Sequence, residues 1–274
     1  MIASLDDVAD ATTTSVGLAG EVLDVADALD AQYMLRRSLS EPNAEAAQRG
    51  HLVEQLLGPR LSQPALALVK AAAERSWPSS EALAQAVRDE GVRLAWRAAV
   101  ADKSVEQARY QVLAMNLVGT VHQGVAPGLA DEARSVADKT ALVTSLVGAD
   151  APVAKLLARC GLSDKRQTFA ANLSGYLDAL AALRGHQRAR VTTAIPLEQR
   201  QADELQTQLT RIYGTPIDLE PVVDARVVGG VRVDAGGDVI DGSIKARLDA
   251  AHDAIANVTQ VSPAVAASKE EHND

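Results

Sequence analysis

The apolar positions of the first two thirds of the chain follow the period of an α-helix. Val22, Ala26 and Leu29 lie on one face of such a helix, because they are spaced by four and three residues. The same spacing returns up to about residue 188, interrupted by turn-forming clusters such as the Trp-Pro-Ser run at residues 77–79. This pattern predicts a series of short amphipathic helices.

The pattern changes after Val191. Residues 191–195 and 217–223 are rich in β-branched residues and predict two strands on either side of a helix over about 198–213. Residues 227–233 predict a third strand that contains a glycine pair, and Gly236-Gly237 predicts a tight hairpin turn after it. A last helix is predicted from about residue 244. The sequence therefore predicts a mainly α protein, with two tandem N-terminal helical bundles followed by a small α+β domain with a hairpin sheet.

The two bundles are predicted from an internal repeat. The octet HLVEQLLG at residues 51–58 aligns without gaps with ALVTSLVG at residues 141–148, an offset of 90 residues. A constant offset along the flanking helices indicates duplication. Each copy ends in a long amphipathic helix, and Ser163 is the predicted cap of the second one. We therefore predict a first bundle over residues 1–100, a second copy over 101–188, the α+β domain over 189–258 and a disordered tail over 259–274.

Composition and charge exclude several classes of protein. Of 274 residues 47% are hydrophobic but only 3% are aromatic, which favours close packing of alanine-rich helices. The formal net charge of −9 opposes binding to nucleic acid and direct binding to anionic lipid. No apolar run reaches the length of a membrane span, and no secretory signal is predicted. Cys160, the single cysteine, is predicted to be a small buried apolar residue.

No catalytic or metal-binding motif stands out. Signatures of zinc peptidases, phosphate-binding loops and paired metal-binding thiols are missing from the sequence, and the histidines are scattered. Asp234, Asp238 and Asp241 are the best candidates for a cation site. However, Asp238 follows the hairpin glycines and Asp241 precedes a predicted helix, where carboxylates commonly accept backbone hydrogen bonds. We therefore predict no catalytic residue, no metal site and no cofactor.

The run VDARVVGGVRVDAGGDVIDGSIKARL, residues 223–248, closely resembles the C-terminal signature of a known family. The family is the delta subunit of bacterial F-type ATP synthases, the homologue of the oligomycin-sensitivity-conferring protein (OSCP). The matching positions are Asp224, Gly229, Gly230, Val239, Ile240, Asp241, Gly242, Ser243 and Arg247. The duplicated bundle is similar to the long actinobacterial form of that family.

This resemblance implies a non-catalytic stator subunit that joins the catalytic head of the ATP synthase to its peripheral stalk and resists rotary torque. It implies that a helical bundle binds the N-terminal helices of the α subunits. It also implies that the C-terminal domain binds the C-terminal end of the b subunit or subunits. The location it implies is peripheral, at the cytoplasmic face of the bacterial cell membrane and without insertion.

The resemblance and the helical pattern together nominate two sets of interface residues. The candidate α-subunit groove in the first bundle consists of Leu52, Leu56, Leu66 and Val69. The family signature and candidate stalk interface consist of Asp224, Val227, Val228, Gly229, Gly230, Ile240, Asp241, Gly242, Ser243, Ile244, Arg247 and Leu248.

Two other classes stay open at this point. A generic α-helical adaptor unrelated to ATP synthase would need no more than tandem bundles and an acidic surface. An enzyme whose active site is assembled from scattered residues is the other. The sequence also leaves open which bundle binds the α subunits, and whether the extra bundle gives a longer reach, a second α-subunit contact or a replacement for stalk length.

Overall fold

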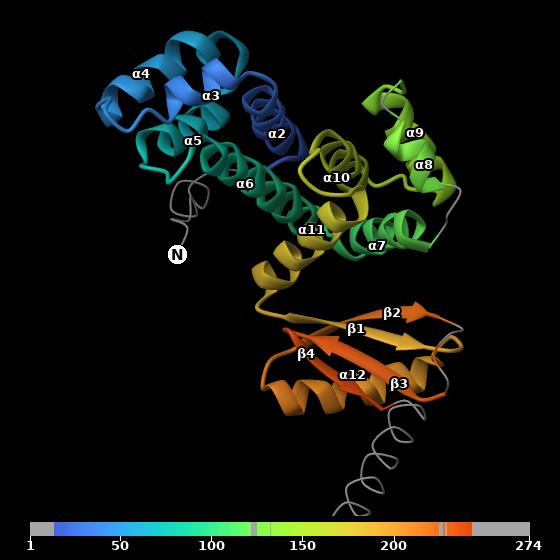
Figure 1. Cartoon of the computed structure of the whole chain (residues 1–274). Coiled ribbons are helices and arrows are strands. Elements are labelled where there is room, and N and C mark those ends of the chain that lie inside the picture. The colour runs from blue at the N-terminus through green and yellow to red at the C-terminus, as the bar shows by residue number, and fades with distance from the viewer. Residues whose placement is uncertain (1–13, 122–124, 132, 225–226, 228, 243–274) are drawn as a thin grey trace, which may run out of the picture. The chain divides into compact units, whose positions relative to one another are not determined.

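A computed structural model describes residues 14–121, 125–131, 133–224, 227 and 229–242 (Figure 1). Contacts divide the chain into two compact units, which we call unit 1 (Met1–Arg184) and unit 2 (Gly185–Asp274). The predicted helix from residue 244 and the predicted disordered tail over 259–274 lie outside the described residues.

Unit 1 is helical throughout its described part, which confirms the prediction of a mainly α chain. We call α2 to α6 the first half and α7 to α11 the second half. The elements are α2 (Val16–Ala31), α3 (Tyr33–Leu39), α4 (Ala46–Leu57), the 3-10 helix η1 (Gly58–Arg60), α5 (Gln63–Glu74), α6 (Ser80–Ala101), α7 (Val105–Val121), α8 (Val125–Ala130), α9 (Val136–Leu146), α10 (Pro152–Ser163) and α11 (Phe169–Arg184).

Serine and threonine side chains start many of these helices. Ser62, for example, accepts a hydrogen bond from the backbone N–H of Ala65 at the start of α5. The prediction that Ser163 caps the last helix is wrong. Ser163 ends α10 and donates to the carbonyl of Arg159, whereas Thr168 accepts from the N–H of Ala171 at the start of α11. A turn separates the two helices. It is stabilised by the Asp164 carboxylate, which accepts a hydrogen bond from the backbone N–H of Arg166 at 3.1 Å.

The helices of the two halves recur in the same order, close to the offset of 90 residues. α2 begins at residue 16 and α7 at residue 105, while α4 begins at residue 46 and α9 at residue 136. In each half the first helix packs against the last, and the third packs against the fourth. These features agree with duplication. The boundaries near residues 100 and 188 stay predictions, and within unit 1 one hydrophobic core runs through both halves.

Close helix approach characterises that core. Trp96 of α6 is fully buried, and its indole N–H donates to the carbonyl of Tyr176 in α11 at 2.8 Å. A Cβ added at Gly91 of α6 would lie 2.7 Å from side-chain atoms of Leu23 in α2, so only glycine allows this separation of the two helices. The low aromatic content is thus compatible with a dense core.

Unit 2 contains a four-stranded mixed sheet and one helix in its described part. The elements are β1 (Gln187–Thr193), α12 (Gln199–Tyr213), β2 (Ile217–Val223), β3 (Val231–Ala235) and β4 (Asp238–Asp241). The strand order is β2-β1-β3-β4. β1 and β2 are parallel and are connected by α12, whereas β3 is antiparallel to both β1 and β4. The predicted hairpin is therefore present, but it is attached to a βαβ unit that the sequence reading did not identify.

The helix α12 covers one face of the sheet. Its Leu209 is buried with Ala189 and Val191 of β1, Ile217 of β2 and Val233 of β3. A capping box between Glu198 and Gln201 starts the helix, and Gly214, with a φ of 70°, ends it as predicted. β1 begins four residues before the predicted Val191, because its pairing with β2 already starts at Gln187.

The two glycine pairs have different roles. Gly236 and Gly237 have φ values of 61° and 92° and form the predicted turn between β3 and β4. Gly229 and Gly230 were predicted inside a strand, and this is wrong. Their φ values of 64° and 80° belong to the turn that precedes β3, which begins at Val231.

Candidate partner-binding surfaces

The described signature residues Asp224 and Gly242 lie near the end of β1 in unit 2 and the start of β3. β2 and β3 lie on opposite sides of β1, and Thr193 at the end of β1 is in register with Val223 and Val231. The chain must therefore cross the end of β1 between them. Asp224 starts this crossing, since its N–H donates to the Thr193 carbonyl at 2.8 Å and its carbonyl accepts from Val227 at 3.0 Å.

Gly242, near the end of the signature run, lies beside the first residue of β3. The N–H of Gly242 donates to the carbonyl of Val231 at 2.9 Å, and a Cβ added at Gly242 would lie 3.1 Å from that oxygen. The signature glycines are therefore explained by backbone geometry, at least where the structure describes them. Val228, Ser243, Ile244, Arg247 and Leu248 of the predicted set lie outside the described side chains.

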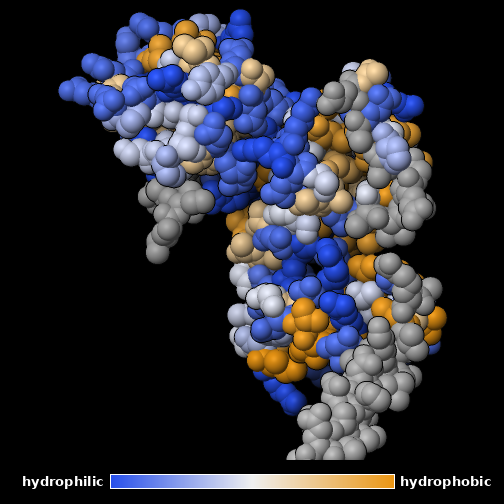
Figure 2. Space-filling view, in the orientation of Figure 1, coloured by the Kyte–Doolittle hydropathy of each residue, from blue (hydrophilic) through white to orange (hydrophobic). Residues whose placement is uncertain are grey.

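Large apolar side chains are exposed around this crossing and along β4. They are Ile195, Val223, Val239 and Ile240. β4 is an edge strand, and all four of its residues are exposed. Figure 2 shows hydrophobic side chains gathered on the visible surface of unit 2. Exposed apolar residues on an edge strand are a feature of binding surfaces.

The face of the sheet opposite α12 is charged. Glu220 of β2 is buried and forms ion pairs with Arg188 and Arg190 of β1. The imidazole of His186 lies 2.9 Å from the carboxylate of Asp218. The two faces of this small sheet therefore differ in chemistry, with the apolar core on the α12 side.

The four residues predicted as an α-subunit groove lie on α4 and α5, which pack against each other. Val69 belongs to the buried core, and Leu52 and Leu66 pack partly buried against it. Leu56 is 49% exposed. The four therefore lie on two helices that pack together, and Leu56 is the most exposed of them.

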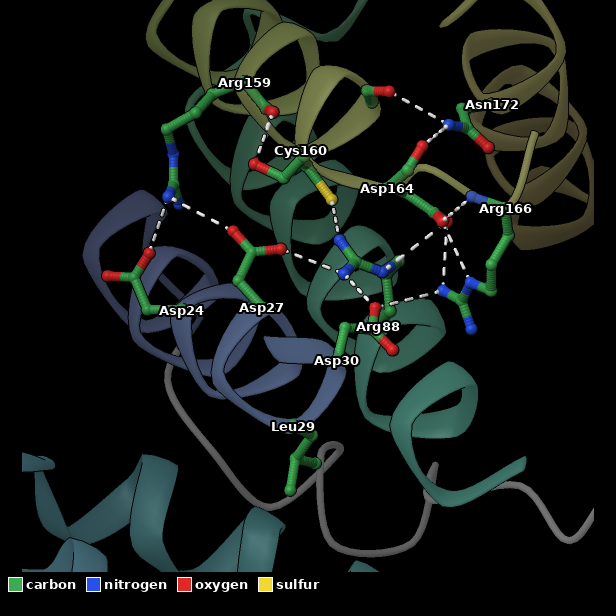
Figure 3. A network of polar contacts seen from close by, with 12 residues as sticks. Asp24, Asp27, Leu29, Asp30, Arg88, Arg159, Cys160, Asp164, Arg166 and Asn172 are labelled. Carbon is green, nitrogen blue, oxygen red and sulfur yellow. Dashed lines mark hydrogen bonds and ion pairs between the residues drawn. The ribbon is translucent and has the colours of Figure 1, made fainter. Parts of the chain in front are cut away.

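A polar network that the sequence reading missed lies inside unit 1, where helices from both halves meet (Figure 3). Its centre is Arg88 of α6, whose side chain is 1% exposed. One guanidinium nitrogen lies 2.9 Å from Asp27 and 2.7 Å from Asp30 of α2. Another donates to the sulfur of Cys160 in α10 at 3.1 Å, and Nε lies 3.7 Å from Asp164.

These contacts favour the ionised forms of Arg88 and Asp164. Burial by itself lowers the pKa of the Arg88 guanidinium, but its contacts with Cys160, Asp30 and Asp27 outweigh this and raise the pKa above its ordinary value. Burial alone would raise the pKa of Asp164, yet hydrogen bonds from Arg166 and the nearby Arg88 charge hold it below the usual range. Arg88 and Asp164 are therefore buried charges held by ion pairs, whereas Asp27 and Asp30 at the edge of the network keep partial contact with solvent.

Cys160 is fully buried, as predicted, but its surroundings are not apolar. Its sulfur contacts Arg88 and lies 3.2 Å from the hydroxyl of Tyr176. Burial raises the pKa of the thiol, so it stays protonated at neutral pH. A signal for this network was present in the sequence, because Asp24, Asp27 and Asp30 recur every three residues along α2.

A groove of about 960 Å³ runs between α6 and α11. Four pairs of lining residues are related by the offset of 90: Gln85 and Gly175, Asp89 and Ala179, Val92 and Ala182, Arg93 and Leu183. At these four positions α6 carries polar or charged residues except for Val92, whereas α11 carries only small or apolar ones, although elsewhere α11 also lines the groove with Asn172, Tyr176 and Asp178.

Within the described residues, no group of three or more histidine, cysteine or acidic side chains is arranged to hold a metal ion. Asp234, Asp238 and Asp241 are all exposed along the β3–β4 hairpin. None of the described helices is long and apolar enough to span a membrane.

Comparisons with known proteins point to one family. The family model described as "ATP synthase delta (OSCP) subunit" matches residues 95–255. This match begins in the last part of α6 and covers the second half of unit 1 and most of unit 2.

Relatives of similar length extend the likeness to most of the chain. The "ATP synthase subunit delta" of Cutibacterium acnes is 34% identical over 248 residues, which cover 90% of this chain and 94% of that protein. The protein of the same name from Beutenbergia cavernae is 31% identical over 89% of this chain and 91% of its own length. That of Streptomyces avermitilis is 32% identical over the same shares. These alignments are longer than the segment matched by the family model, so they include part of the first half.

Proposed function

The chain belongs to the ATP synthase delta (OSCP) subunit family, and from this premise we propose which of its surfaces join the parts of that enzyme. It is a non-catalytic subunit of the peripheral stalk of an F-type ATP synthase. The observation that carries this conclusion is the family match over residues 95–255, together with delta subunits that align with about nine tenths of the chain. The alternatives of a generic helical adaptor and of an enzyme are not favoured.

The mechanical task explains the construction of unit 1. A stator must hold the catalytic head still while the central shaft turns, so that proton flow remains coupled to ATP synthesis. A continuous core of short helices that satisfies its own buried charges resists deformation better than loosely tethered bundles. The subunit is a peripheral part of the complex, and we place it at the cytoplasmic face of the bacterial cell membrane.

We assign the N-terminal helices of the α subunits to unit 1, and within it to the second half. The family model includes the second half and only the end of the first, which supports the second half as the bundle common to the family. It presents Tyr110 of α7, an aromatic ring that is 61% exposed, and exposed tyrosines are frequent anchors for partner helices. The first-half groove with Leu52, Leu56, Leu66 and Val69 remains the competing location.

We assign the C-terminal end of the b subunit or subunits to unit 2. Among the exposed apolar residues of unit 2, Ile240 lies on the edge strand β4 and offers a contact for the apolar side of a stalk helix. The stoichiometry of b-peptide binding, measured by the titration described next, gives the number of b chains that the subunit holds.

Titration calorimetry of the full chain with two separate peptides tests both assignments. One peptide is the N-terminal helix of the α subunit and the other is the C-terminal helix of the b subunit. We expect Tyr110→Asp to weaken binding of the α peptide by about tenfold or more, because a charge replaces an apolar anchor. Tyr33→Asp is the matched control, since Tyr33 is 53% exposed on α3 of the first half.

The variants distinguish between the two candidate sites for the α peptide, and they test the site for the b peptide separately. If Leu56→Asp weakens α-peptide binding and Tyr110→Asp does not, the first-half groove is the site and our assignment to the second half is wrong. For the b peptide, Ile240→Asp should weaken binding by about tenfold, and Ile212→Asp, the same change at a more exposed isoleucine on α12, should not. Unchanged b-peptide affinity in the Ile240 variant contradicts the assignment to unit 2.

A further inference from the structure

Helix α10 belongs to the second half, yet it also packs on the first half. Besides its contacts with α7, α9 and α11, it contacts α2 and α6. α5 contacts α2 and α6 as well. Both helices of the α2–α6 pair are therefore in contact with α3 and α5 of their own half and with α10 of the second half.

At Gly20, the absence of a side chain on α2 leaves room for α10. A Cβ built at Gly20 of α2 would lie 4.0 Å from a methyl carbon of Leu156 in α10. This is ordinary van der Waals contact, so a side chain larger than alanine at residue 20 would push against α10.

Charge complementarity supports the same contact. Arg159 of α10 lies 2.7 Å from Asp24 and 3.6 Å from Asp27 of α2. Arg88 of α6 donates to Cys160 of α10 and lies near Asp164 just after that helix. Basic and acidic groups thus alternate across the contact, and the buried ones have no access to water as an alternative partner.

The corresponding face of the second half has different residues. The offset of 90 places Tyr110 opposite Gly20, Ala114 opposite Asp24, Leu117 opposite Asp27 and Asp178 opposite Arg88. A bulky ring replaces the glycine, two acids are replaced by apolar residues, and the arginine becomes an acid. The face of the first half that carries Gly20, Asp24, Asp27 and Arg88 therefore suits the side chains of α10, whereas the face that carries Tyr110, Ala114, Leu117 and Asp178 offers a helix neither the same space nor the same charges.

We propose that the α2–α6 face of the first half is a helix-docking surface whose occupant is α10 of the same chain. This docking joins the two halves of unit 1 into one body, and it makes this face of the first half unavailable to a helix from another subunit. The docking is internal to the chain and does not depend on the identity of any partner.

Hydrogen exchange of the full chain, read by mass spectrometry, tests this docking. Gly20→Trp places a large ring between α2 and α10. We expect amide exchange to rise by about tenfold or more in both α2 and α10, since both lose the same contact. Gly17→Trp is the matched control, because a Cβ at Gly17 of the same helix meets only the hydroxyl of Ser15 within 4 Å.

A second pair of variants covers the case in which Gly20→Trp does not fold. Leu156→Ala trims the facing side chain on α10 and should raise exchange in α2, whereas Leu146→Ala, exposed on α9, should not. If each variant exchanges like its control, or if exchange rises in α10 while α2 is unchanged, α10 is not docked on α2 and the proposal is overturned.

Discussion

The two halves of unit 1 share an order of helices and a mode of packing, but they differ at the face where a further helix can bind. In the first half, Gly20 and Arg88 accept α10 from the other half. In the second half, Tyr110 and Asp178 stand at these positions. Core residues such as Val53 and Val143, in contrast, are buried alike. Packing at this pair of core positions has thus stayed equivalent, while the outer faces carry different residues.

The difference also appears at the contact between α6 and α11. Four pairs of corresponding positions line the same groove, with Asp89 and Arg93 on α6 facing a wall where Ala179 and Leu183 stand at the same positions of α11. A duplicated fold therefore need not give two copies of one binding site, because a few substitutions on the outer face decide what each copy binds.

The largest expected effect comes from Arg88. Replacing it by methionine leaves the carboxylates of Asp27, Asp30 and Asp164 without their common partner. We expect Arg88→Met to lower the free energy of unfolding by about 3 kcal/mol, the low end for breaking a buried ion pair, because Asp27 and Asp30 keep some contact with water. Urea unfolding followed by circular dichroism measures it.

The counterpart position provides the control for Arg88. Asp178 is exposed, so Asp178→Ala should change the free energy of unfolding by less than about 0.5 kcal/mol. If both variants were destabilised equally, the two faces would carry similar internal contacts and the difference between the halves would not hold.

A second comparison concerns the core positions that the halves share. Val53→Ala and Val143→Ala each remove two methyl groups from a fully buried site, and each should cost about 1–2 kcal/mol. Because one core runs through unit 1, we expect each variant to shift the same single unfolding transition of that unit. Two transitions in calorimetry, each moved by only one of the variants, would instead indicate halves that unfold independently.

Much of the fold could be predicted from local patterns. The strand at residues 217–223, the end of α12 at Gly214 and the hairpin at Gly236-Gly237 follow from β-branched runs and from glycines with positive φ. The parallel pairing of β1 with β2 could not, because it joins segments that are separated by a whole helix and leaves no local signal. Gly229-Gly230 was misplaced since a glycine pair fits both a bulge and a turn.

The binding surfaces were less predictable than the fold. The family signature predicted a stalk interface within unit 2. The exposure of Ile240, however, depends on β4 being an edge strand, which only the sheet order shows. The charge network was missed because Asp27 and Arg88 are far apart in the sequence, and each alone looks like an ordinary solvated residue. Their meeting is a property of tertiary packing, which the periodicity of single helices does not encode.

The smallest expected effect is a dependence on pH that distinguishes the two walls of the groove. Burial raises the pKa of Asp89 on α6, although Gln85 donates a hydrogen bond to its carboxylate at 2.6 Å. A raised pKa in the folded state means that ionised Asp89 opposes folding, and that its protonation relieves this cost.

An asparagine side chain at residue 89 can still accept the hydrogen bond from Gln85, so Asp89→Asn should stabilise the protein at pH 7, by less than about 1 kcal/mol. Below the unfolded pKa of about 3.9 the carboxyl is protonated in both states, so the gain should disappear, and it should return as pH rises through the folded pKa. Urea unfolding at pH 7 and pH 3 measures this, with Asp178→Asn on the opposite wall as the control. A gain of equal size at both pH values would mean that the Asp89 charge does not oppose folding and that the walls differ only in shape.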